Sequence, residues 1–428
     1  MQAKIYFTKD HRIDPSLIDA DALYVLKKLQ DAGFIAYLVG GSVRDLLIQK
    51  IPKDFDISTS ARPEQIKAIF QKQCILIGRR FPLAHVRRFH HKFGHKIIEV
   101  STFRSGKNDS DLIIQDNEWG SPEEDVLRRD FTINGLFYDS TTHSIIDYVG
   151  GWNDIRSHTL RVIGEPETRF KQDPVRLLRL FKFQARYNFH IDPKTKEAIE
   201  FCREEIIKSS PARVLEELFR MLESGASAPF FRLLAENNFL FLLFPELMET
   251  LHTPQGKRIF HYLACADQIY KHKGKNVLDR AVLCSCLIFP LVEKELHDEF
   301  LNKKHYPHIG EITLLTSAII KRVFVHSFSH FPRKISSLMV SIIVAQYRIT
   351  PLVGKRHYRE KLLKHKDFYL ALQFLKIRAL VDEHYVDIYT SLRNQYRQAS
   401  HPERKRHPPP PVRRPNHHSQ QELHAPQI

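Results

Sequence analysis

Residues 38–57 restrict the possible folds of this chain more than any other stretch. An apolar run over 34–39 has the character of a buried strand, and it ends in Gly40 and Gly41. Ser42 follows, in a position to cap a short helix. A strand, two glycines and a helix N-terminus form an anion site, because backbone N–H groups and the helix dipole both favour negative charge there. The stretch therefore predicts a cradle for phosphate groups.

Two aspartates follow the predicted helix at a spacing that places them on one face of a strand. Asp54 and Asp56 are two residues apart, and side chains alternate along a strand, so Phe55 and Ile57 point the other way, into the core. Neighbouring carboxylates repel each other, and folding alone gives no reason to pair them. Mg²⁺ gives one, because it binds carboxylates together with substrate phosphates. A Gly-Gly turn or an Asp-x-Asp pair is common by itself, but their combination predicts a metal site beside a phosphate cradle.

A third carboxylate lies on a later predicted strand. Glu99 stands within an otherwise apolar run over 96–104. A buried carboxylate is costly unless it is paired or bound to a metal, so we expect Glu99 to complete an acidic cluster with Asp54 and Asp56. The alternative is a glutamate on an edge strand that faces water.

The first of these motifs resembles a known family. The sequence Gly-Gly-Ser-Val-Arg-Asp over 40–45, followed closely by Asp54 and Asp56, is similar to the nucleotidyltransferase motif of the class II tRNA nucleotidyltransferase and poly(A) polymerase family. Members have a polymerase-β-like catalytic domain and add nucleotides to RNA 3′ ends without a template. The resemblance implies that Asp54 and Asp56 bind two Mg²⁺ ions. It also implies that the triphosphate of ATP is held by Gly40, Gly41, Ser42 and Arg44.

A second motif lies on a helix that begins after Ser121, where a first-turn proline and a capping-box glutamate follow. Asp130 and Asn134 are four residues apart, so they share a helix face, which by itself is typical of a charged helix surface. The segment resembles a second family motif. That resemblance implies that Arg128 and Asn134 contact the incoming nucleotide and that Asp130 is an essential acid. Strand geometry favours Glu99 as the third acid, so both stay candidates.

A third motif begins the helical part of the chain, which starts near Glu167. Asp173, Arg176 and Arg179 are three residues apart on one face of a predicted helix, where salt bridges are the ordinary explanation. Without a template, however, protein must read the base, and a guanidinium and a carboxylate can hydrogen-bond a base edge. The segment resembles the family's base-recognition motif, although Gln172 replaces the usual Glu. The resemblance implies that Asp173 and Arg176 select adenine, with Arg179 as a further nucleotide contact.

Basic residues predict where RNA binds. Arg79 and Arg80 form either a solvated turn or an RNA contact, and their stretch resembles the poly(A) polymerase branch, from which CCA-adding enzymes usually differ. In the C-terminal half, basic and aromatic residues alternate over 326–334 and 354–366, which is typical of phosphate contacts combined with stacking. Lys355 and Arg356 are the candidate RNA contacts there, and the alternative is an ordinary solvated surface.

Composition agrees with a polyanionic partner. The formal net charge is +16, which favours nucleic acid over an acidic membrane surface because no long uncharged apolar run exists. The N-terminus lacks the apolar core of a signal peptide. The five cysteines are scattered, which predicts reduced thiols in a cytoplasmic protein.

Together these patterns predict an α+β fold with a polymerase-β-like nucleotidyltransferase domain and an all-helical remainder. The expected parts are an N-terminal helix (1–33), a catalytic domain (34–164), a neck for base recognition (165–225), an RNA-binding body (226–392) and a disordered basic tail (393–428). The predicted activity is Mg²⁺-dependent addition of AMP from ATP to RNA 3′ ends, with release of pyrophosphate. The alternatives are a CCA-adding tRNA nucleotidyltransferase and a non-catalytic RNA-binding protein of the same fold.

Overall fold

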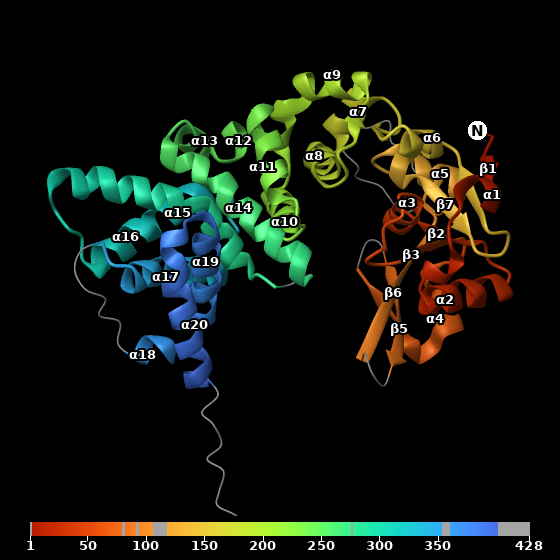
Figure 1. Cartoon of the computed structure of the whole chain (residues 1–428). Coiled ribbons are helices and arrows are strands. Elements are labelled where there is room, and N and C mark those ends of the chain that lie inside the picture. The colour runs from red at the N-terminus through yellow and green to blue at the C-terminus, as the bar shows by residue number, and fades with distance from the viewer. Residues whose placement is uncertain are drawn as a thin grey trace, which may run out of the picture.

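The computed structural model describes residues 2–78, 82–90, 94–105, 118–274, 277–352 and 360–400. The predicted RNA contacts Arg79, Arg80, Lys355 and Arg356 lie outside these residues, as does most of the predicted tail. Figure 1 shows a sheet-containing head at one side, a helical body at the other, and an arch of α7, α8 and α9 between them. The predicted fold class, a mixed sheet with helices followed by an all-helical region, is confirmed.

An eight-stranded sheet forms the head, with the order β1-β8-β7-β2-β3-β6-β5-β4. β3 and β6 run parallel, and the other neighbours run antiparallel. The strands are β1 (Lys4–Tyr6), β2 (Ala36–Val39), β3 (Asp56–Thr59), β4 (Cys74–Ile77), β5 (Leu83–His90), β6 (Gly94–Thr102), β7 (Leu136–Asp139) and β8 (Ser144–Asp147). Within the range 1–33, which was predicted as an N-terminal helix, β1 pairs with β8 and extends the sheet at its edge.

Alternation along the strands divides the apolar side chains between two faces of this sheet. Leu38 and Tyr138 belong to the main core, which also takes the buried face of α2, whereas Val39 and Phe137 belong to a small cluster that includes Val126 of α5. The helices of the head are α1 (Thr8–His11), α2 (Ala20–Asp31), α3 (Gly41–Leu47), α4 (Pro63–Phe70), α5 (Pro122–Leu127) and α6 (Gly151–Arg156). The short helix α3 begins two residues after the end of β2, which is an inner strand of the sheet.

Helices make up the rest of the described chain, apart from a two-stranded parallel pair, β9 (Thr159–Leu160) and β10 (His190–Ile191). They are α7 (Pro166–Gln172), α8 (Val175–Tyr187), α9 (Pro193–Cys202), α10 (Pro211–Leu222), α11 (Ser227–Glu236), α12 (Phe239–Leu243), α13 (Pro245–Leu251), α14 (Pro254–Lys273), α15 (Arg280–Glu299), α16 (Ile309–Ile320), α17 (Arg333–Ile349), α18 (Glu360–Leu363), α19 (Phe368–Val381) and α20 (Val386–Ser400). Within the described ranges, no helix has both the length and the apolar character needed to cross a membrane.

Two helix predictions were wrong in detail. The helix that begins after Ser121 ends at Leu127, and only a 3₁₀ turn (Thr132–Asn134) follows, because the backbone between them pairs with 161–163. At the other end of the chain, α20 continues to residue 400, beyond the predicted tail boundary at 393. Beyond the boundary, Tyr396 packs against Phe368 of α19, which holds this part of the helix against the body.

Candidate active site

The glycine turn after β2 has the conformation that its sequence demands. Gly40 caps α3 with φ 66° and ψ −126°, which an L side chain adopts only with strain. A Cβ on Gly40 would also lie 3.3 Å from Nη1 of Arg129. Ser42 was predicted to be the cap, but it lies inside the helix, where its buried hydroxyl donates to the carbonyl of Val39 at 3.0 Å. Glycine therefore provides the cap, and the serine holds the turn against the strand.

The two aspartates lie at the same edge of the sheet as this turn. Asp54 and Asp56 are exposed, while Phe55 and Ile57 are buried, so the predicted alternation is confirmed. Asp56 is paired in register with Val39, the last residue of β2 before the glycines. Strand pairing thus brings the carboxylates beside the start of α3.

Like charge gathers around Asp56. The pKa of Asp56 is raised to about 6, first because protein atoms around the accessible carboxylate displace part of its hydration, then because Glu99 and Asp54 repel its negative form. Arg129 acts in the opposite direction. Within the described residues, no group of three or more His, Cys, Asp or Glu side chains is arranged to hold a metal by itself. The oxygen donors nevertheless fit Mg²⁺, which is bound through one or two carboxylates together with substrate phosphates.

Glu99 occupies the next strand over. It is paired in register with Asp56 across the parallel strands β3 and β6, so the two acids are neighbours as expected. The reason given from the sequence was wrong, however, because the Glu99 side chain is half exposed rather than buried. Its Oε1 lies 3.5 Å from Nε2 of His85 on β5.

Asp130 is placed differently from the other candidate acids. It is buried, and its Oδ2 lies 2.7 Å from Nη2 of Arg179 on α8. Its Oδ1 accepts hydrogen bonds from the N–H of Phe131 at 2.8 Å and from Nδ2 of Asn134 at 2.9 Å. Burial alone would raise the pKa of Asp130, but Arg179 and these donors outweigh it and lower the pKa. Asp130 therefore joins the head to α8 through an ion pair.

Arg44 is also held inside the protein. Its guanidinium lies near the rings of Phe183 (5.0 Å) and Tyr187 (4.8 Å) on α8. It donates to Oδ1 of Asp45 at 2.7 Å, to the hydroxyl of Tyr187 at 2.8 Å and to Oδ1 of Asn134 at 2.6 Å. Arg44 and Asn134, both predicted to contact the nucleotide, thus belong to a network that links α3 to α8.

Arg129 lies at the site, although it was not among the residues predicted from the sequence. This residue donates to Oδ2 of Asp125 at 2.8 Å and to the hydroxyl of Ser58 at 3.3 Å, and it lies against Gly40. Arg128, which was predicted instead, donates to the carbonyl of Ser105 at 2.9 Å. The i,i+4 spacing of Asp125 and Arg129 was a usable signal, because it gives Arg129 a fixed position.

The predicted base-recognition residues do not share one helix face. Asp173 ends α7, and α8 begins only after Pro174. Asp173 Oδ2 accepts from Nη2 of Arg213 at 3.0 Å, whereas its buried Oδ1 has no hydrogen-bond partner in the described structure. Buried Arg176 donates to the carbonyls of Arg169 at 3.0 Å and Arg128 at 3.3 Å.

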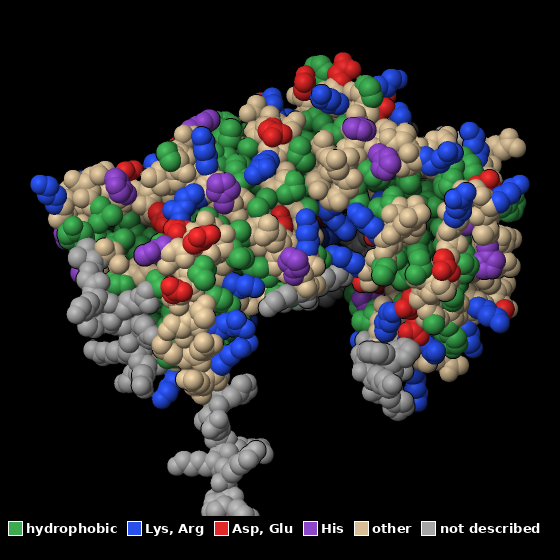
Figure 2. Space-filling view, in the orientation of Figure 1, with side chains coloured by type: hydrophobic (Ala, Val, Ile, Leu, Met, Phe, Trp, Pro, Cys, Tyr) green, Lys and Arg blue, Asp and Glu red, His purple; other side chains and the backbone are tan. Residues whose placement is uncertain are grey.

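Figure 2 shows that these elements border an open hollow between the head and the helical body, with Lys and Arg side chains on its inner wall. The model of the poly A polymerase head domain matches residues 36–161, which include the glycine turn, Asp54, Asp56 and Glu99. Models described as the probable RNA and SrmB-binding site of polymerase A and as the polymerase A arginine-rich C-terminus match 188–251 and 319–421.

Poly(A) polymerase I of Salmonella typhimurium is 34% identical over 392 residues, which are 87% of this chain and 81% of that protein. The chain belongs to the poly(A) polymerase I family of class II nucleotidyltransferases. Poly(A) polymerase I of Escherichia coli O157:H7 is likewise 34% identical, over 89% of this chain and 83% of its own length.

CCA-adding enzymes match a shorter part of this chain in sequence than the poly(A) polymerases do. The CCA-adding enzyme of Lactobacillus helveticus is 39% identical over 202 residues, which are 47% of this chain and 49% of that protein. A solved structure of the Bacillus stearothermophilus CCA-adding enzyme with CTP has a TM-score of 0.64 and 26% identity, and the match covers 91% of this chain and 84% of that one. The fold is therefore common to both branches.

Proposed function

We propose that this protein is a polynucleotide adenylyltransferase, which adds AMP from ATP to the 3′ hydroxyl of RNA and releases pyrophosphate. The observation that carries this proposal is the register of β2 and β3, which sets Asp56 and its neighbour Asp54 beside the glycine turn. Similarity to poly(A) polymerase I over most of both chains supports the choice of reaction.

Asp54 and Asp56 would hold two Mg²⁺ ions, since their exposed oxygens suit this cation. The ions would lower the pKa of the RNA 3′ hydroxyl and stabilise the charge on pyrophosphate. The N–H groups at the start of α3 and the guanidinium of Arg129 would orient the triphosphate, because both lie at Gly40.

Glu99 is our candidate for the third acid. It lies beside Asp56 and remains half exposed, so it can reach a cation or a substrate group. Asp130 has its charge compensated by Arg179, and we assign it a positioning role instead. This choice departs from the assignment that the family resemblance implies.

Base selection would fall mainly to Asp173. Its Oδ1 has no hydrogen-bond partner in the described structure, so it can accept from the exocyclic amino group of adenine. Arg176 and Arg179 keep α7 and α8 in place against the head. RNA would enter the basic hollow between head and body. The five free thiols suit the predicted cytoplasmic location.

The experiment that tests this function uses the purified full chain with Mg²⁺, a labelled single-stranded RNA and each NTP in turn. We expect a ladder of products with ATP alone. Addition restricted to tRNA and requiring CTP would establish the CCA-adding alternative. RNA binding by the wild-type protein without any incorporation would establish the non-catalytic alternative, and Asp54→Ala serves as the control that separates catalysis from binding.

A further inference from the structure

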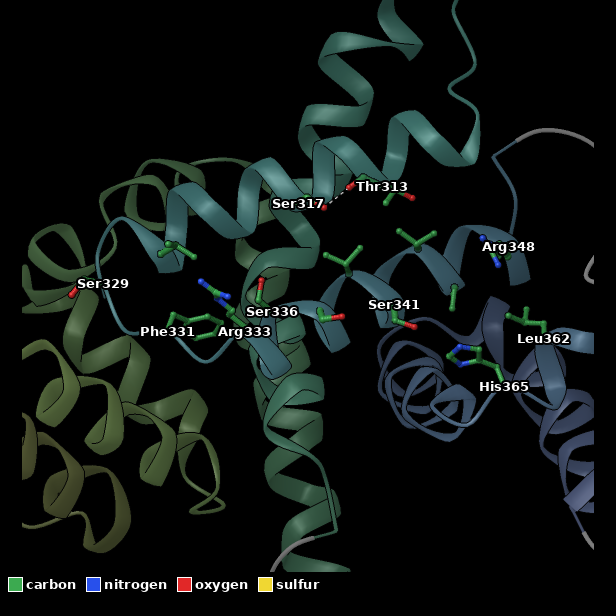
Figure 3. Close-up of a pocket in the computed structure, with 15 residues that line it drawn as sticks. Thr313, Ser317, Ser329, Phe331, Arg333, Ser336, Ser341, Arg348, Leu362 and His365 are labelled. Atoms are coloured by element: carbon green, nitrogen blue, oxygen red, sulfur yellow. Dashed lines mark hydrogen bonds between the residues drawn. The ribbon is translucent and has the colours of Figure 1, made fainter.

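A groove on the helical body lies outside the site described above. α16 and α17 form its walls, and the residues that end α18 close one end, as Figure 3 shows. Its volume is about 800 Å³. The polar side chains that matter here are Arg333, Ser336, Ser337, Ser341, Arg348 and His365.

Among the residues that the structure describes, the charged side chains lining this groove have one sign. No acidic residue is found among its described lining residues. Arg333 and Arg348 are exposed, and neither makes a hydrogen bond or ion pair within the described chain. By contrast, exposed Arg213 of the neck pairs with Asp173, and exposed Arg220 pairs with Glu217. Two uncompensated guanidinium groups in one groove attract an anionic ligand.

The two arginines stand at opposite ends of one helix face. They are fifteen positions apart on α17, which corresponds to about 22 Å along a helix. Ser337 and Ser341 follow Arg333 at intervals of four residues, so they lie in the row between the two cations. These hydroxyls have no hydrogen-bond partner in the described structure and are available as donors.

The floor of the groove is aliphatic. Val340 and Val344 lie one turn apart beside the serine row and line the same space. Phe328 and Phe331 lie in the predicted RNA-binding segment 326–334, but both rings are largely buried, and of the two only Phe331 lines the groove. Arg333, from the same segment, supplies a cation to the groove (Figure 3).

We infer that this groove binds single-stranded RNA several nucleotides upstream of the 3′ end. A nucleic-acid strand carries phosphates at regular intervals, so it can meet a cation at each end of the groove and hydroxyl donors between them. Its sugars and base faces can cover the valines. Figure 1 places α16 and α17 on the part of the body away from the sheet, so this contact is separate from the carboxylates. The inference depends on the proposed function in one respect, namely that the bound polyanion is RNA.

The test compares two double variants that remove the same charge. Arg333→Gln with Arg348→Gln alters the groove, whereas Arg393→Gln with Arg397→Gln alters exposed arginines of α20 that also have no partner in the described structure. Binding of a labelled 30-nucleotide RNA is measured without nucleotide at several salt concentrations. For the groove variant we expect about tenfold weaker binding and a salt slope smaller by about 1.4, for two lost phosphate contacts. The control pair should change binding far less.

Ser341→Asp provides a second variant, because it places a negative charge between the arginines, and it should also weaken binding. Melting temperatures of all variants should match the wild type, since the changed side chains are accessible. Equal losses in the groove and control pairs, or an unchanged salt slope, would overturn the inference. So would groove-dependent binding of an oligoglutamate peptide with unaltered RNA binding. Missing AMP incorporation alongside groove-dependent RNA binding would reject only the proposed function.

Discussion

The substitution Asp130→Asn separates a structural acid from a catalytic one. It keeps the size of the side chain but leaves Arg179 without its partner at 2.7 Å. Breaking a fully buried ion pair costs about 3–5 kcal/mol in unfolding free energy. Because 37% of the Arg179 side chain is exposed, water can replace part of the interaction, and we expect a loss of about 3 kcal/mol, at the low end of that range. The matched control is Asp56→Asn, which removes mutual repulsion and should leave stability unchanged or slightly raised.

Thermal and urea unfolding at neutral pH measure this difference, and AMP incorporation is followed in parallel. The Asp130→Asn protein should melt about 6–12 °C below wild type, while Asp56→Asn should melt normally and lose incorporation. The pKa of Asp130 is lowered by folding, so its stabilisation is present above its unfolded pKa and disappears as the pH falls through the folded value. The stability difference between Asp130→Asn and wild type should therefore shrink in acid. If Asp130→Asn melts like wild type but loses incorporation as Asp56→Asn does, our structural assignment is wrong.

Three further outcomes follow from the site. At limiting Mg²⁺, incorporation should decline as the pH falls through about 6, which is the raised pKa of Asp56. Glu99→Gln should move this decline to lower pH, because one charge that repels the Asp56 carboxylate is gone. An unchanged pH profile in Glu99→Gln would contradict the pairing of the two acids. Tyr187→Phe removes a hydroxyl that bonds to Arg44, so chemical denaturation should show a loss of about 1–2 kcal/mol in unfolding free energy. Asp173→Ala should reduce the preference for ATP over CTP in competition assays, and retained selectivity would remove Asp173 from base recognition.

Local patterns in the sequence were sufficient for the core of the site. The Gly-Gly turn, the alternation around Asp54 and Asp56, and the buried stripe of α2 all depend on residues close together in the chain. Such features can be predicted from neighbouring residues, because the conformational freedom of glycine and the periodicity of side chains along a helix or strand are local properties. A strand, a glycine turn, a short helix and an acidic pair were therefore predictable, although the helix cap was assigned to Ser42 and is Gly40 in the structure.

Contacts between distant residues decided the rest. Glu99 became a neighbour of Asp56 through the parallel register of β3 and β6, whereas the local apolar pattern suggested burial that the structure does not have. Arg44 and Asp130 carry the charges of a nucleotide site, yet each is engaged by a partner from α8. A sequence motif specifies which charge is present. Whether that charge binds substrate or pairs with another side chain depends on which groups the tertiary structure places next to it.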